Sequence, residues 1–74
     1  MNKQRREFIA KSVQEIYDVI ATLEAVKDEE MEAYENMPEN LQYSERGETM
    51  SDNIDSLEEI IEMLMDATTT LEDM

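Results

Sequence analysis

The side chains of this sequence that could do chemistry are almost all carboxylates. The chain holds 20 Asp and Glu residues against six Lys and Arg residues, with no His and no Cys. Dense acidic runs occur at Asp28-Glu29-Glu30, followed by Glu32 and Glu35, and at Glu58-Glu59, followed by Glu62. Paired carboxylates can act as general acid and base when burial drives their pKa values apart. These residues fall mostly off the apolar positions, so the sequence predicts a solvated acidic surface without catalytic residues.

Nucleophilic and metal chemistry lack their usual residues in this chain. The serines have no His to activate them, and a single Gly cannot build a phosphate-binding loop. Soft metals would find neither thiolate nor imidazole, and the spacing of a calcium loop is absent. The sequence therefore predicts a non-enzymatic protein with no cofactor and no dedicated metal site. Adventitious binding of divalent cations is the alternative role for the acidic runs.

The charge is large and unevenly distributed. The formal net charge is -14. Residues 1–13 nevertheless carry a net charge of +3, because this segment contains four basic residues, Lys3, Arg5, Arg6 and Lys11, and one acidic residue, Glu7. Residues 14–74 therefore sum to -17. Such a surface repels nucleic acid and anionic membranes and attracts basic protein surfaces. We expect a basic protein partner, no direct contact with nucleic acid and no contact with a membrane.

Two features bear on location. No apolar run approaches the roughly 20 residues that a membrane-spanning helix needs. The basic residues near the start are not followed by the apolar stretch of a secretory signal. The expected compartment is the cytoplasm.

The helix breakers Pro38 and Gly47 stand within ten residues of each other, and the chain has no other Pro or Gly. One interruption between two long segments predicts a single domain over residues 1–74. The first helix is expected over about residues 3–36, the linker over about 37–43 and the second helix over about 44–72. A short linker between long helices favours an all-α, antiparallel two-helix hairpin.

Apolar residues recur along both predicted helices with alternating intervals of three and four. In the first helix this heptad spacing breaks at Lys27 and Glu30, so the seam is expected to shift there and resume at Met31. Either Lys27 snorkels out of the seam, or the two polar residues select register or partner. The second helix keeps the spacing throughout, with Thr68 as the one polar residue. Its hydroxyl is expected to bond a carbonyl one turn earlier.

The linker carries two candidate caps and two apolar residues. Asn36 is predicted to cap a short turn with Pro38 in its first turn, and Ser44 to cap the second helix. Leu41 and Tyr43 are expected to fold over the open end of the helix pair.

The hairpin has two further expected consequences. The basic residues Lys3, Arg5 and Arg6 should lie near Asp66, Glu72 and Asp73. Two helices cannot cover both flanks of their apolar stripes, and a chain this short without disulfides gains stability by association. The sequence thus predicts a homodimer that forms a four-helix bundle. The predicted core and dimer residues are Ile9, Val13, Ile16, Ile20, Leu23, Ile54, Leu57, Ile61 and Leu64.

Rows of carboxylates on a rigid helical rod can imitate the phosphates of duplex DNA and occupy the nucleic-acid groove of a basic protein. Simple solubility of a small acidic bundle is the alternative. The partner-binding residues predicted on this basis are Asp28, Glu29, Glu32, Glu35, Glu39, Tyr43, Glu58, Glu59 and Glu62.

The linker also carries a resemblance. The stretch Tyr34–Gln42, which contains Asn36-Met37-Pro38-Glu39-Asn40-Leu41-Gln42, is followed by Ser44-Glu45-Arg46 and an acidic helix with Leu57-Glu58-Glu59. This pattern resembles small, mostly uncharacterised acidic helical proteins of Gram-positive phages and mobile elements, over about half of the chain. The resemblance implies a location in the host bacterial cytoplasm and a role as an inhibitor of a host defence factor that binds nucleic acid. A structural or assembly accessory protein, with the homodimer as functional unit, is the alternative.

Overall fold

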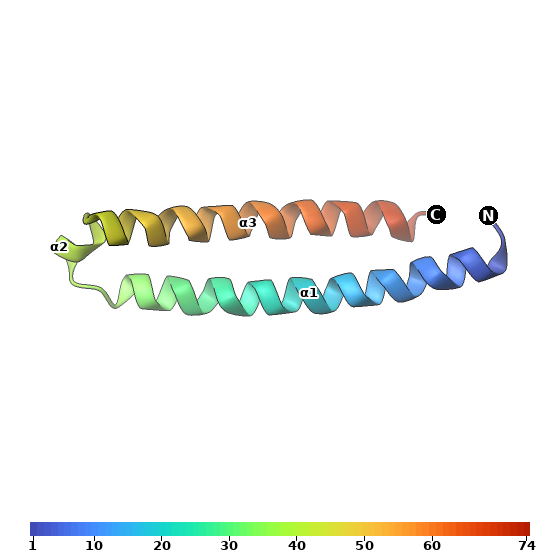
Figure 1. Cartoon of the computed structure of the whole chain (residues 1–74), viewed down its shortest axis with the longest axis horizontal. Coiled ribbons are helices and arrows are strands. Elements are labelled where there is room, and N and C mark those ends of the chain that lie inside the picture. The colour runs from blue at the N-terminus through green and yellow to red at the C-terminus, as the bar shows by residue number, and fades with distance from the viewer.

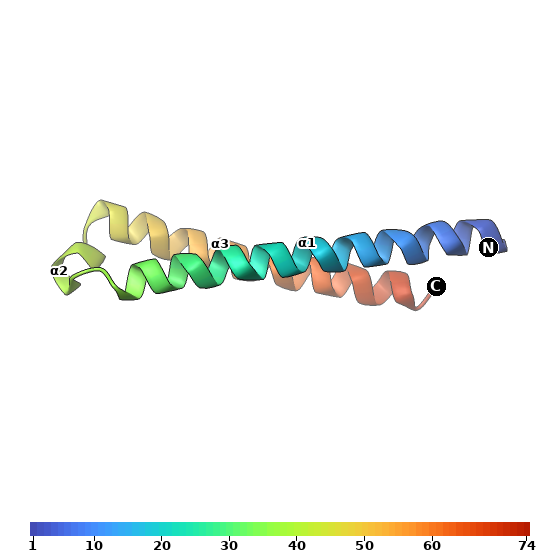
Figure 2. The ribbon, with the colours of Figure 1, turned by 90° about the horizontal axis from the view of Figure 1, so that it is seen from below.

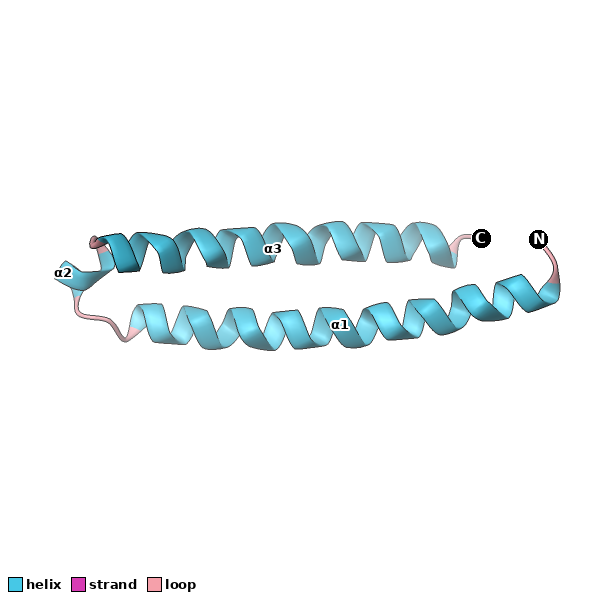
Figure 3. Ribbon diagram, viewed as in Figure 1, coloured by secondary structure: helices cyan, strands magenta, loops and turns pink.

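The computed structural model describes all 74 residues and contains helices only. Helix α1 spans Lys3–Glu35, the single turn α2 spans Glu39–Gln42, and α3 spans Glu45–Glu72. The two long helices lie antiparallel, with α2 at the turn between them (Figures 1 and 3). The all-α hairpin predicted from the spacing is confirmed. The predicted linker differs in one respect, since it holds the helical turn α2.

The hairpin is a thin rod. Its Cα atoms extend over 58 × 14 × 13 Å, with a radius of gyration of 17.0 Å. The two long helices cross at a shallow angle when the rod is turned (Figure 2), as expected where a heptad seam winds one helix around another. The first turns of α1 project beyond the end of α3 (Figures 1 and 2).

Both long helices begin at a residue that caps them. The Asn2 side chain accepts a hydrogen bond of 2.8 Å from the Arg5 backbone N–H, and the Ser44 hydroxyl accepts one of 3.3 Å from the Gly47 N–H. The Ser44 cap is as predicted. The prediction for Asn36 was wrong, because Asn36 ends α1 and does not begin α2. Pro38 takes the cap position of α2, which suits its fixed φ and missing N–H.

The core is one seam of side chains between α1 and α3. Its buried residues recur every seven positions, at Val13 and Ile20 in α1 and at Gly47, Ile54, Ile61 and Thr68 in α3. Half-buried residues alternate with them at Ile9, Ile16 and Leu23, and at Leu57 and Leu64. All nine residues expected in the core or the dimer thus lie in this seam of the single hairpin.

Thr68 is the most deeply buried side chain of the protein, with 1% of its surface exposed. Its hydroxyl donates a hydrogen bond of 2.6 Å to the carbonyl oxygen of Leu64. The predicted bond to the preceding turn is confirmed, and it explains how a polar group is tolerated at this depth.

The expected break of the seam at Lys27 and Glu30 was wrong, although Met31, where the stripe was expected to resume, is also half-buried. Both residues are half-buried at the seam positions, and the intervals of three and four continue unbroken to Tyr34 and Met37. The end of α3 lines one pocket with the residues of α1 from Arg6 to Gln14, and the seam residues Val13 and Leu71 both lie in it, which gives an approximate antiparallel register. Counting equal rises along both helices from that pair places Lys27 level with Leu57. The physical reason for the continuous seam is that long side chains can bury their alkyl stems while the charged ends reach water.

We predict that Lys27→Leu stabilises the hairpin by about 1 kcal/mol, because an apolar side chain would fill a half-buried seam position. Urea denaturation followed by circular dichroism measures the change. The matched control is Lys11→Leu at an exposed position of the same helix, where little change is expected. Equal effects of the two substitutions would contradict burial of Lys27 in the seam.

Gly47 allows the backbone of α2 to approach α3. A Cβ atom at this position would lie 2.3 Å from the Gln42 carbonyl oxygen and 2.6 Å from that of Leu41. The Gln42 side chain completes the turn by donating to the carbonyl oxygens of Tyr34 and Met37, at 3.0 and 3.3 Å. The end of the rod is therefore closed by backbone and an amide. Leu41 and Tyr43 were expected to fold over this end, but they do not. They are 45% and 75% exposed.

Gly47→Ala should destabilise the protein by roughly 1–3 kcal/mol, because backbone atoms of α2 would have to move away. At an ordinary helical position the same change stabilises by up to about 1 kcal/mol, so the sign of the effect is diagnostic. Thermal unfolding compared with the exposed Thr49→Ala variant provides the measurement. A raised unfolding temperature for Gly47→Ala would rule out the close approach of α2.

Candidate functional site

One side-chain hydrogen bond joins the two long helices across their flank. The Tyr17 hydroxyl of α1 donates to the Glu72 carboxylate of α3, 55 residues away in the sequence. The two residues lie at different levels of the rod, and both side chains lean toward the N-terminus of their own helix, which brings them together. The bond shows that the Tyr17 flank of α1 and the Glu72 flank of α3 form the same side of the hairpin.

Carboxylates fill this side. Residues spaced by three and four from Tyr17 or Glu72 share its flank. On α1 they include Glu24, Asp28 and Glu35, and on α3 they include Glu48, Asp55, Glu58 and Glu62. With Glu72 these make eight carboxylates, all exposed, and from Ala10 onward no Lys or Arg shares the flank. We call this set of eight the acidic face.

The structure divides the residues that the sequence suggested for partner binding. Asp28, Glu35, Glu58 and Glu62 lie on the acidic face. Glu32 and Glu59 lie on the outer backs of their helices, and Glu29 lies on the flank opposite Tyr17. Glu39 and Tyr43 belong to the turn at the end of the rod.

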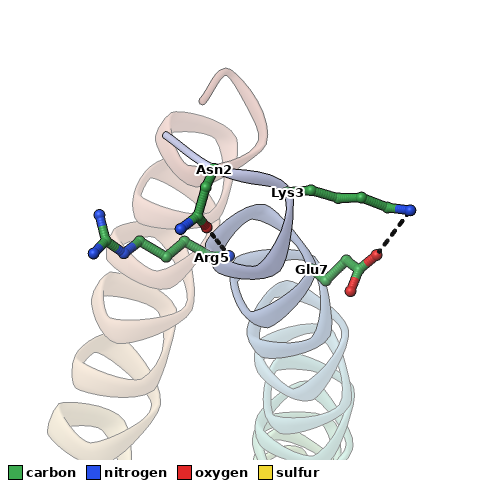
Figure 4. A network of polar contacts seen from close by, with 4 residues as sticks. All are labelled: Asn2, Lys3, Arg5 and Glu7. Atoms are coloured by element: carbon green, nitrogen blue, oxygen red, sulfur yellow. Dashed lines mark hydrogen bonds and ion pairs between the residues drawn. The ribbon is translucent and has the colours of Figure 1, made fainter.

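Few cations neutralise these acids within the hairpin. The one ion pair is Lys3–Glu7, at 3.9 Å within the first turns of α1 (Figure 4). The expected pairing of Lys3, Arg5 and Arg6 with the acids at the end of α3 does not occur. The first turns of α1 project past α3, and Arg6, which lines one pocket with Glu72, makes no ion pair with it. The Arg6 guanidinium instead donates to the Met1 carbonyl oxygen, at 2.8 and 3.2 Å.

The carboxylates of the acidic face are exposed to solvent. Of the 20 carboxylates, only Glu30 is even half-buried. No three of them converge on a point where a metal ion could be held. Neither long helix has a stretch apolar enough to cross a membrane. What the arrangement can do chemically is to offer a row of acceptors, without competing cations, to a basic surface.

Sequence reasoning missed the pair Tyr17–Glu72, which defines the acidic face. Tyr17 lies beside the apolar seam, where the spacing alone gives it no partner. The signal was present in principle, because an antiparallel register brings the end of the second helix near the first third of the first helix.

Comparison with protein families, with curated proteins and with solved structures finds no match to this chain.

The Tyr17–Glu72 contact gives the acidic face a titration signature. The hydrogen bond to Glu72, followed by partial desolvation and the negative charge of Glu72, raises the pKa of Tyr17 above its ordinary value of 10.0. The contact therefore stabilises the fold below that ordinary value and is lost as the pH rises through the raised pKa.

We predict that Glu72→Gln returns the pKa of Tyr17 toward its ordinary value. Tyrosinate absorbance, measured with Tyr34 and Tyr43 replaced by Phe, reports the titration. The matched control is Glu62→Gln, which removes a charge from the same face but not from the hydrogen bond. An equal fall of the Tyr17 pKa in both variants would show that the hydrogen bond is not the main cause.

Proposed function

We propose that this chain is a non-enzymatic binding protein of a phage or mobile element that engages a basic host protein through its acidic face. Its target is a nucleic-acid-binding defence factor, which it inhibits by occupying the surface that nucleic acid would use. The observation that carries the proposal is the row of eight exposed carboxylates on one flank of the rod. From Ala10 to the end of the chain, no Lys or Arg lies on that flank.

The density of charge along the rod supports mimicry. The eight carboxylates of the acidic face, spread over a rod of 58 Å, amount to about one for every 7 Å of length. One strand of duplex DNA carries a phosphate every 3.4 Å or so. A basic groove that tracks a phosphate backbone would therefore meet a carboxylate at about every second phosphate position, held on a stiff helical scaffold.

The resemblance of the linker supports a phage or mobile-element origin. It does not bear on how the acidic face binds a partner. The residues Asn36–Gln42 and Ser44–Arg46 link the chain to acidic helical proteins of Gram-positive phages and mobile elements. A phage protein of this kind would act in the host bacterial cytoplasm, where its partner would be a host protein.

We also propose that the hairpin works as a homodimer that forms a four-helix bundle. Only four hydrophobic residues of the 74 are buried in the single hairpin. Chains of this size usually need a further source of stability, and this one has no disulfide.

The homodimer by itself favours the second candidate function, that of a structural or assembly accessory protein. Its specific support is the apolar surface that the hairpin leaves uncovered, including Val19, Val26 and Ile60. Salt separates the two functions, because contact between charged surfaces weakens as ionic strength rises whereas apolar assembly does not.

Capture from a Gram-positive lysate tests the inhibitor proposal. The immobilised protein should retain basic nucleic-acid-binding proteins at low salt and release them steeply as salt increases. A variant with Asp28→Asn, Asp55→Asn, Glu58→Gln and Glu62→Gln should lose that retention. The matched control neutralises four carboxylates on the backs of the helices, with Glu32→Gln, Asp52→Asn, Glu59→Gln and Asp66→Asn.

Each captured protein is then expressed and tested for displacement of its DNA or RNA by the wild-type chain. Retention of no basic protein at low salt would refute the proposal. So would equal losses in the two variants, since only total charge would then matter. Capture that resists high salt would support the assembly function.

A further inference from the structure

The side of the hairpin opposite Tyr17 is nearly free of charge. On α1 its residues follow intervals of three and four from Phe8 to Ala33, and on α3 from Arg46 to Thr70. Its only charged residues are Glu15, Glu29 and Arg46. No acid lies in the α3 part, although α3 carries nine of them. We call this surface the neutral face.

Exposed apolar side chains are more numerous on the neutral face than on the flank of the acidic face. Five large hydrophobic side chains lie there with 41–62% of their surface exposed: Phe8, Val19, Val26, Ile60 and Met63. On the helical part of the opposite flank, Tyr17 and Met65 are the only two of comparable exposure. An apolar stripe on one flank of a rod indicates an interaction surface.

Charge decides which partner can use this surface. Two copies of a chain with net charge -14 repel each other wherever their carboxylates meet. The neutral face is the one long surface on which a second copy can pack without facing rows of acids. A face of 58 by 14 Å also covers roughly 800 Å², the area per partner of a standard interface.

The position of the apolar residues fixes the centre of the contact. In the register set by Val13 and Leu71, Ile60 is level with about residue 24 of α1, and Met63 with about residue 21. Both lie between the levels of Val19 and Val26. The stripe is therefore centred near the middle of the rod, where a two-fold axis perpendicular to its length would bring both copies of it together.

Charge along the rod selects the orientation. The projecting start of α1 carries Lys3, Arg5, Arg6 and Lys11, and the turn end of the rod carries the acids from Asp28 to Glu39. A rotation about the central axis would set each basic end over the acidic end of the other copy. A parallel arrangement would instead place the basic ends together and the acidic ends together.

The dipole of α1 also favours the antiparallel arrangement of the two copies. Its first turn contains no acid and its last turn no base, so the charges at both ends oppose the helix dipole. Within one hairpin the only ion pair at either end is Lys3–Glu7. Opposite charges from a second, antiparallel copy would relieve both ends at once.

We propose that the neutral face binds a second copy of this chain, with the two hairpins antiparallel about a two-fold axis near the level of Val19 to Val26. The basic projection of each copy lies beside the Asp28–Glu39 end of the other. The acidic faces of both copies then point outward. This geometry rests on the homodimer proposed above and specifies its surface and orientation.

Single substitutions test the surface. Met63→Asp, on the neutral face, should raise the dissociation constant of the dimer at least tenfold, as measured by sedimentation equilibrium. The matched control is Met65→Asp, an exposed Met on the opposite flank, which should leave dimerisation unchanged. Circular dichroism establishes that both variants keep their helices, which their exposure of 61% and 49% favours. A dimer broken by Met65→Asp but not by Met63→Asp would overturn the neutral face as the interface.

A spin label tests the orientation. The chain has no Cys, so Gln4→Cys, at an exposed position in the projecting end, gives one labelled site per copy. The antiparallel arrangement places the two labels about 50 Å apart at a rise of 1.5 Å per residue. A parallel arrangement would place them on the order of 20 Å apart, within two helix diameters. The short distance would refute the orientation but leave the homodimer standing, whereas a monomer at all concentrations would refute both.

Discussion

The continuous packing of α1 against α3 is the constraint on which the rest of this small protein depends. Four buried hydrophobic residues at seven-residue intervals form its centre, and nothing covalent or metallic supplements them. The seam can remain continuous because its polar members are accommodated. Thr68 satisfies its hydroxyl within its own helix, and Lys27 and Glu30 are only half-buried. A break at any of them would divide an already minimal core.

The seam also determines where charge can go. Once the packing of α1 on α3 defines the seam, each remaining position falls on one flank, on the other flank or on the back of its helix. The acids concentrate on the flank of Tyr17 and Glu72 and on the backs of the helices, and they almost avoid the opposite flank. One flank can therefore present charge to a foreign surface while the other remains available for an apolar contact.

The helices, the Ser44 cap of α3 and the hydrogen bond of Thr68 could be predicted from the sequence, because each depends on local spacing or on a hydrogen bond within one turn. Predictions failed where they depended on the relative position of distant segments. The basic start of α1 makes no ion pair with the acids of α3, since the two helices end at different levels. Leu41 and Tyr43 remain exposed because Gly47 admits the α2 backbone itself. The contact between Tyr17 and Glu72 shows which flank of α1 lies beside which flank of α3, and this contact depends on the register of the two helices.

The elongated shape of the hairpin has a consequence for how the molecule behaves in solution. A globular protein with a radius of gyration of 17.0 Å would contain about 220 residues, roughly three times the length of this chain. A single hairpin of 8.7 kDa would therefore diffuse slowly for its mass and leave a sizing column early, as though it were already an oligomer. Hydrodynamic size and molar mass are thus separate quantities for this rod, and only methods that measure mass directly can count its copies.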